Sequence, residues 1–135
     1  MFDTISDAIL LIGIEPDGHF RLLLANAAFT RNTGHSKDVI GKLVEEVVTP
    51  ESYRLLKRRY QKVATTKQAI TYTEWYDVPL GRREFEVKLI PILNAVGQCA
   101  QIAAVTHDST EFHNLREENK ALRLALQKAG KATPQ

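Results

Sequence analysis

The side chains of this 135-residue sequence best suited to metal binding or catalysis are its four histidines and its single cysteine. The histidines are scattered over a predicted turn, a helix start, a strand end and the C-terminal segment: His19, His35, His107 and His113. No two of them share one element at zinc-ligand spacing. His107, Asp108 and His113 form the best metal-binding candidate, yet solvated polar groups at a strand end are the favoured interpretation. The sequence has no Gly-rich phosphate loop, H-E-x-x-H helix or G-x-S-x-G elbow, so we expect no catalytic residues, no metal site and no enzyme.

The composition is that of one globular domain, with 44% hydrophobic and 25% charged residues. Cys99 has no partner for an internal disulfide, which favours a reducing compartment, and we expect a cytoplasmic protein. The apolar run from Ala8 to Ile14 is too short to cross a bilayer and lacks a cationic leader. We therefore expect a buried strand there and no membrane contact by this segment. A net charge of +2 gives no argument for nucleic-acid binding.

Alternation of side chains and turn residues such as "PDG" and "NAVG" predict five strands, at 8–15, 19–25, 69–78, 83–92 and 99–107. Between the second and third strands the period becomes helical, with short helices within 26–41 and a longer helix over 50–67. Asn26 is the predicted N-cap of the first short helix, and Gly34 is its predicted end. A terminal helix follows the last strand, with Asp108 or Ser109 as its predicted N-cap. The chain thus alternates in blocks, two strands, helices, three strands and a helix, which is typical of an α+β domain.

The predicted helix 50–67 carries most of the basic residues of the middle of the chain. Its tyrosine and aliphatic side chains step by three or four residues along one face, which we expect to be buried. The basic side chains fall off that face and have no aromatic residues interleaved with them: Arg54, Lys57, Arg58, Arg59 and Lys62. A solvated basic face is therefore favoured over direct nucleic-acid binding.

The segment NAAFTRNTGHSKDVIG, from Asn26 to Gly41, resembles the PAS domain family when it is taken with this order of elements. The family pattern there is N-x-A, a hydrophobic helix, T-G-Y, an acidic residue and a glycine. The matching residues are Asn26, Ala28, Thr33, Gly34, Asp38 and Gly41, and the departure is His35, where tyrosine is usual. PLGRREFEVKLIPI and HDST resemble the penultimate strand and the D-I-T motif that ends the core, with Ser109 in place of the apolar middle residue.

The resemblance implies a PAS fold, in which a five-stranded antiparallel sheet carries helices on one face and encloses a cavity that can hold a small ligand. It divides the chain into a sensory domain at 3–108, a C-terminal signalling and dimerisation helix at 109–129 and a flexible terminus at 130–135. PAS domains are sensors in bacterial histidine kinases, diguanylate cyclases and transcriptional regulators. We expect such a module, followed by an output domain in a longer parent protein; the alternative is a stand-alone ligand-binding or interaction domain acting in trans.

The positions of histidine and cysteine bear on the cofactors known in this family. Haem-binding members commonly use a histidine on the long helix, and the predicted helix 50–67 has none. Flavin photoreceptors use a cysteine on a short helix, whereas Cys99 falls in the predicted last strand. Both chemistries are disfavoured, which leaves an organic metabolite or no ligand, and the cofactor stays unassigned.

Strands and helix that face the predicted cavity supply its candidate lining: Leu11, Leu24, Tyr60, Phe85, Val87, Leu89 and Val105. The alternative, that these side chains only fill the core, is favoured over ligand binding. Trp75 and Tyr76 are adjacent in one strand and so point to opposite faces of the sheet. We expect one of the two to be exposed or at an interface.

The C-terminal segment EFHNLREENKALRLALQKA carries a heptad pattern. Positions a and d are Phe112, Leu115, Asn119, Leu122, Leu126 and Ala129. A buried asparagine at a favours two strands in one register, since only its counterpart satisfies the amide. Charges flank this seam, with Glu111 and Glu118 at g and Arg116 and Arg123 at e.

These charges favour a parallel homodimer, in which each g residue meets the e residue five positions later on the partner chain. We expect the helix to pass a signal through such a coil. The alternative is a helix that folds back onto its own sheet, and Leu124, at position f, shows that the seam is imperfect.

Overall fold

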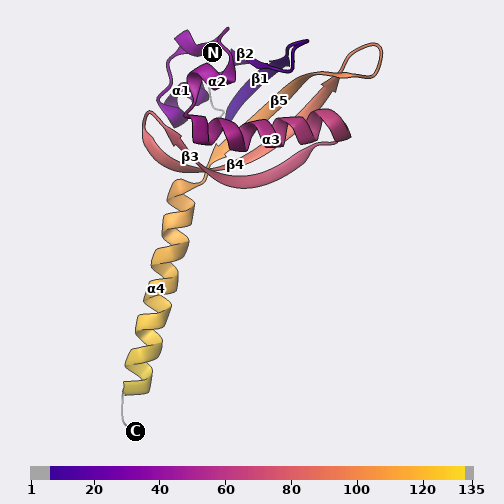
Figure 1. The fold of residues 1–135 in the computed structure, drawn as a ribbon. Coiled ribbons are helices and arrows are strands. Elements are labelled where there is room, and N and C mark those ends of the chain that lie inside the picture. The colour runs from indigo at the N-terminus through magenta and orange to yellow at the C-terminus, as the bar shows by residue number, and fades with distance from the viewer. Residues whose placement is uncertain (1–6, 133–135) are drawn as a thin grey trace.

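The computed structural model describes residues 7–132, apart from the side chains of 111–114 and 130–132. Its elements are β1 (Ala8–Ile14), β2 (Phe20–Ala25), α1 (Ala27–Thr33), the 3-10 helix η1 (Lys37–Val39), α2 (Val44–Val47), α3 (Pro50–Thr66), β3 (Ile70–Val78), β4 (Gly81–Leu93), β5 (Cys99–Asp108) and α4 (Thr110–Ala132). Figure 1 shows α1, α2 and α3 gathered over one face of the sheet, while α4 projects away from the domain. None of the helices described is long and apolar enough to cross a membrane.

The strands form one sheet in the order β2-β1-β5-β4-β3, with every neighbouring pair antiparallel. β3, β4 and β5 follow one another as a meander, and the last strand pairs with the first, so β5 lies at the centre between β1 and β4. The α+β class and the five-stranded antiparallel sheet predicted from the sequence are confirmed.

The hydrophobic core lies between the inner face of the sheet and α3. Ile12, Leu89 and Ile102, from three adjacent strands, are at most 1% exposed, and Val63 of α3 is fully buried against the same cluster. Burial of each such aliphatic side chain contributes about 1.5–3 kcal/mol. This packing holds α3 across the sheet and fixes the walls of the space between them.

A β-bulge in β2 changes which side chains reach the core. The pairing with β1 runs Leu11 with Leu24 and then Ile12 with Leu22, so Leu23 is an extra residue on β2. Strict alternation from the buried Leu22 would place Leu24 on the inner face. The bulge reverses the alternation, and Leu24 lies on the outer face with 62% of its surface exposed.

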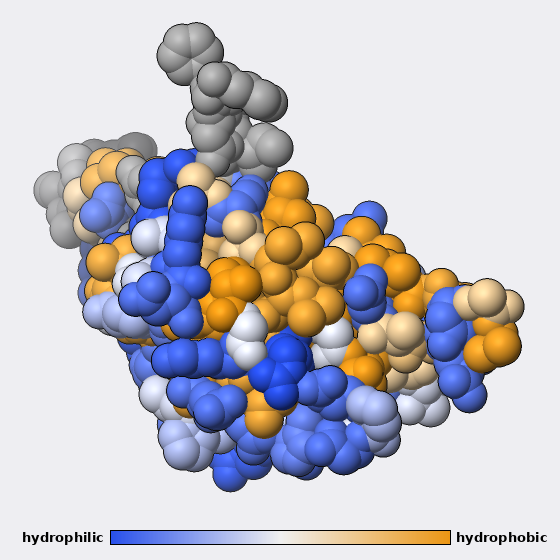
Figure 2. Space-filling view, turned by 90° about the horizontal axis from the view of Figure 1, so that it is seen from above, coloured by the Kyte–Doolittle hydropathy of each residue, from blue (hydrophilic) through white to orange (hydrophobic). Residues whose placement is uncertain are grey.

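The outer face of the sheet is partly apolar. Ile9 is 40% exposed there, and a shallow hollow on this side is lined by Ile9, Leu10, Leu11, Leu24, Ala25, Asn26 and Ala103. Figure 2 shows apolar side chains gathered across the middle of the molecule when it is viewed from above.

The end caps of α1 depart in part from the sequence prediction. Asn26 occupies the N-cap position, but its side chain makes no capping hydrogen bond. Its amide accepts from the backbone N–H of Ile9 at 3.0 Å and donates to the carbonyl of Asp7 at 3.0 Å, so it ties the helix start to β1. Gly34 ends the helix with φ +84°, as predicted, and a Cβ there would lie 2.9 Å from Cγ of Leu80.

The helix α4 begins immediately after the last strand. β5 ends at Asp108, where the predicted sensory domain ends, and α4 runs to Ala132, past the predicted helix end at 129. Where the structure describes it, α4 packs mainly against β4, and every side chain described from Leu115 to Ala129 is exposed. The alternative in which this helix folds back onto its own sheet is therefore wrong for the described part of the chain (Figure 1).

Candidate functional site

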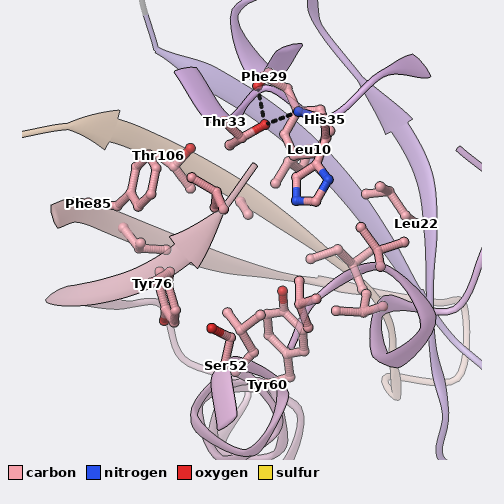
Figure 3. A pocket seen from close by; sticks show the side chains of 18 of the residues that line it. Leu10, Leu22, Phe29, Thr33, His35, Ser52, Tyr60, Tyr76, Phe85 and Thr106 are labelled. Atoms are coloured by element: carbon pink, nitrogen blue, oxygen red, sulfur yellow. Dashed lines mark hydrogen bonds between the residues drawn. The ribbon is translucent and has the colours of Figure 1, made fainter. Parts of the chain in front are cut away.

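The principal cavity lies between the inner face of the sheet and the helical layer of α1, α2 and α3. Its volume is about 100 Å³. Apolar side chains from both layers make up most of its walls, among them Leu10, Ile12, Leu22, Phe29, Val44, Val47, Val48, Leu56, Tyr60, Val78, Phe85, Val87, Leu89 and Ala104. Figure 3 shows these side chains converging from the strands and from α1 and α3.

Three tyrosines bring phenol groups to this apolar cavity. Tyr72 and Tyr76 lie four residues apart on the inner side of β3, and the hydroxyl of Tyr76 donates to that of Tyr72 at 3.1 Å. Tyr60 reaches the cavity from α3, and its ring packs edge-on against Phe20. Burial raises the pKa of all three hydroxyls, so each remains a neutral phenol at physiological pH.

The guanidinium of Arg59 lies 4.2 Å from the ring centre of Tyr72 and 3.3 Å from a carboxylate oxygen of Glu74. This cation–π contact and ion pair hold α3 to β3 beside the cavity. Arg59 is therefore not part of a solvated basic face, which was the prediction for this helix.

His35 faces the cavity from the segment between α1 and η1. Its ring stacks on Phe29 with a centroid separation of 5.6 Å and an interplanar angle of 9°. The hydroxyl of Thr33 accepts from its backbone N–H at 3.1 Å and donates to the carbonyl of Phe29, and these bonds fix the loop (Figure 3). Burial lowers the pKa of His35, so the imidazole is neutral near pH 7.

The structure places the seven predicted lining residues on two faces of the sheet. Tyr60, Phe85, Val87 and Leu89 line the cavity. The prediction that Leu11, Leu24 and Val105 line it is wrong. Leu11 pairs with Leu24 across the bulge, and both line the hollow on the outer face.

Val105 lies between two cavity residues, Ala104 and Thr106, and therefore points to the opposite side of β5. Its strand partner Ile9 is also on that outer side.

The two adjacent aromatic residues on β3 also point to opposite faces of the sheet. Tyr76 is buried and lines the cavity, whereas Trp75 faces outward with the guanidinium of Arg82 5.9 Å from its ring centre.

The part of the lining that comes from the helical layer was not predicted from the sequence. Phe29, His35, Val44 and Ser52 belong to four separate elements or loops, and only tertiary packing brings them together. The histidine at position 35, where the family pattern has tyrosine, could have indicated a lining residue, because this position follows the end of a helix that covers the sheet.

The residues relevant to haem, flavin and metal chemistry lie away from the cavity or are engaged elsewhere. α3 carries no histidine, and Cys99, at the start of β5, does not line the cavity. Of the candidate metal ligands, His107 lies 2.7 Å from Asp7 and Asp108 pairs with Arg83, while the side chain of His113 is outside the described residues. Within residues 7–132, as far as side chains are described, no group of three or more His, Cys, Asp or Glu is arranged to hold a metal.

A polar cluster joins β4 to the start of α4. Glu84 precedes the cavity residue Phe85 and so points to the outer side of β4, but it is only 5% exposed because α4 begins over it. The hydroxyl of Ser109 donates to its Oε1 at 2.7 Å, and the guanidinium of Arg116 lies 3.6 Å from the same oxygen. The hydroxyl of Thr110 accepts from the backbone N–H of Glu84 at 2.8 Å. The buried carboxylate accounts for a serine at the middle of HDST.

Asp108 fixes the same junction from β5. Its carboxylate accepts from the backbone N–H of Thr110 at 3.0 Å and from Arg83 at 2.8 Å. Burial acts to raise the pKa of Asp108, but the hydrogen bonds from Thr110 and the Arg83 charge outweigh it and hold the pKa below its usual value. Of the two predicted caps for α4, it is thus Asp108 whose side chain accepts from the helix start, while the Ser109 hydroxyl bonds to Glu84.

The seam of α4 is open to solvent where its side chains are described. Leu115, Leu122 and Leu126 are 49%, 59% and 63% exposed, and Asn119, Glu118 and Arg123 are exposed as well. Arg116, predicted to meet a partner chain, lies near Glu84 of its own chain. The side chains of Glu111 and Phe112 lie outside the described residues.

A family model described as PAS fold matches residues 2–114. Among solved structures, the PAS domain of a protein from Colwellia psychrerythraea is 20% identical with a TM-score of 0.66, over 82% of this chain and 92% of that one. A sensory box sensor histidine kinase from Vibrio cholerae is 19% identical with a TM-score of 0.65, over 80% and 85%.

An RNA-binding light-oxygen-voltage receptor is 21% identical with a TM-score of 0.65, and the match covers 96% of this chain but 37% of that receptor. At these identities the structural matches establish the fold alone. The search of curated proteins finds no match.

Proposed function

From the premise that this chain belongs to the PAS-fold family, we propose that it is the sensory module of a bacterial signal-transduction protein. The module binds a small molecule in the cavity beneath α3 and passes the signal through α4, as a parallel coiled coil, to an output domain in a longer parent protein. The parent is a histidine kinase, a diguanylate cyclase or a transcriptional regulator. The module itself carries no catalysis and acts in the cytoplasm.

One observation supports this proposal most strongly: of two adjacent residues of β4, one lines the cavity and the other contacts the N-terminal end of α4. Phe85 lines the cavity, and the next residue toward the strand start, Glu84, binds Ser109 and Thr110 where α4 begins. Successive side chains of a strand point to opposite faces, so a shift of β4 that follows ligand binding moves both contacts together. The coupling requires that β4 and α4 adopt two discrete arrangements.

The exposed seam supports an intermolecular coil. Leucine side chains at positions d, d and a of α4, Leu115, Leu122 and Leu126, are about half exposed or more. An isolated helix of this length is marginal in water, and burial of the seam against a second copy stabilises it. In such a dimer Asn119 faces its counterpart and Glu118 meets the partner's Arg123. The pair between Glu111 and the partner's Arg116 competes with the contact of Arg116 to Glu84.

The alternative remains a stand-alone ligand-binding or interaction domain that acts in trans. The apolar outer face of the sheet favours it, since an exposed apolar patch is typical of protein-interaction surfaces. Native mass spectrometry of the purified full chain separates the two readings, because it reports oligomeric state and any co-purified small molecule together. A dimer supports the coil; a monomer at micromolar concentration with α4 intact contradicts it and favours the alternative.

A further inference from the structure

Tyr60 is a buried residue whose hydroxyl is open to the cavity, and no hydrogen bond joins that hydroxyl to another described residue. The residue is 4% exposed, and Figure 3 shows its hydroxyl pointing from α3 into the cavity. A hydroxyl that faces a cavity and has no partner in the protein can form its hydrogen bond with a molecule inside that cavity. Because burial raises its pKa, the phenol keeps its proton and is available as a donor.

His35 enters from the opposite wall. Its imidazole points toward the same space as the Tyr60 hydroxyl, one from the α1 side and the other from α3 (Figure 3). No hydrogen bond to either ring nitrogen is found in the described part of the chain, where its ring contact is the stack on Phe29. A neutral imidazole has one donor and one acceptor nitrogen. The two walls therefore supply a phenol donor and an imidazole that donates or accepts.

The charge of the lining excludes an anion. No lysine or arginine belongs to the described residues that line the cavity, and His35 is neutral. The single carboxylate of the lining, Asp77, is about half exposed and lies 3.5 Å from Arg82, which neutralises it. A buried ion without an opposite charge is strongly disfavoured, so the cavity suits an uncharged molecule.

The volume limits the size of that molecule. A cavity of about 100 Å³ is somewhat smaller than the engineered apolar cavity of roughly 150 Å³ that admits benzene. A single six-membered ring is therefore the upper limit without displacement of α3. Aromatic and aliphatic side chains such as Phe29, Phe85 and Leu89 surround that space and suit an apolar ring.

We propose that the cavity binds a small uncharged molecule with one ring and one hydroxyl, held between Tyr60 and His35. The Tyr60 hydroxyl donates to the oxygen of the ligand, and the ligand hydroxyl donates to the acceptor nitrogen of His35. This inference rests on the proposed sensory function and names the class of molecule that the module senses. Simple phenols belong to this class because, like the tyrosine side chain, they are uncharged at pH 7.

Isothermal titration of the full chain with phenol, benzene and benzoate tests the assignment. Benzene keeps the ring without the hydroxyl, and benzoate adds a negative charge at similar size. Phenol is expected to bind most tightly, benzene more weakly and benzoate not at all. Tyr60→Phe and His35→Phe each remove one hydrogen bond and keep an aromatic ring, so each should weaken phenol by about two- to twelve-fold and leave benzene unchanged.

Tyr53→Phe is the matched control, because Tyr53 lies on the same helix but does not line the cavity. Its phenol affinity should equal that of the wild type. Benzene binding as tightly as phenol, or Tyr60→Phe without effect on phenol, would overturn the inference, as would binding of benzoate. Sedimentation of the same samples separates the two proposals. If the protein is a dimer but gives one of the contradicting ligand results above, only the proposed class of ligand is overturned. If it is a monomer and binds none of the three probes, the proposed function and this inference are overturned together.

Discussion

The contact between Ser109 and the buried carboxylate of Glu84 gives the sharpest test of how α4 is attached to the sheet. Both residues are buried, at 7% and 5% exposure, and the hydroxyl donates to Oε1 at 2.7 Å. Ser109→Ala removes this donor, while the guanidinium of Arg116, on a side chain that is 56% exposed, stays 3.6 Å from that oxygen. A buried hydrogen bond to a charged group is worth about 1.5–3 kcal/mol, and this is the expected loss in the free energy of unfolding.

Urea denaturation at pH 7 measures this loss, with the fluorescence of Trp75 as the probe because it is the single tryptophan and lies on β3. Glu84→Gln provides the matched background. It keeps an acceptor for the Ser109 hydroxyl but removes the charge, so Ser109→Ala should cost only about 0.5–1.5 kcal/mol there. A loss below about 0.5 kcal/mol in the wild type, or the same loss in both backgrounds, would refute the reasoning that the carboxylate anchors the helix.

Three further predictions concern the coil, the histidine and the turn after α1. Leu122→Asp, at seam position d, should yield a monomer in sedimentation. Leu124→Asp is the matched control, since Leu124 has similar exposure on the same helix but occupies position f, and this variant should stay dimeric. If the two variants have the same oligomeric state, the heptad assignment is contradicted. Burial lowers the pKa of His35 in the folded state, so below about pH 6.5 the unfolded chain binds more protons at this residue than the folded chain does. The free energy of unfolding therefore falls as the pH is lowered through that range. His35→Phe should lack that part of the pH dependence in denaturant titrations, and an unchanged curve would argue against it. Gly34→Ala should lower the free energy of unfolding by about 1 kcal/mol or more beyond the effect of Gly97→Ala. Both glycines have φ near +80°, but only at Gly34 would a Cβ contact Leu80. Equal shifts of the melting temperature in the two variants would contradict this.

The fold was predictable because its signals are local. The alternation of Phe85, Val87 and Leu89 on β4 defines an inner face without any tertiary information, and all three line the cavity. The predicted stop of α1 at Gly34 rests in the same way on the left-handed backbone that helix ends require.

The predicted lining residues were wrong where the local sequence pattern does not show which face of the sheet a side chain occupies. The apolar run of β1 has no polar residue to mark its outer side, so the direction of Leu11 cannot be read from it. In β2 the extra residue at Leu23 reverses the alternation, and nothing in FRLLLA marks a bulge. The alternation of β4 places Glu84 on the outer face, yet its burial depends on where α4 begins, which is a tertiary property.

The proposed signalling function depends most on α4 forming a parallel coil between two copies of the chain. Spin labels at Glu117→Cys or Leu124→Cys, in a Cys99→Ser background, occupy position f in successive heptads and are exposed in the single chain. Dipolar spectroscopy on each labelled dimer measures the separation between the two copies at that level of the helix. A parallel coil predicts well-defined and nearly equal separations at both positions. Absence of dipolar coupling, or widely different separations at the two positions, would contradict the central claim.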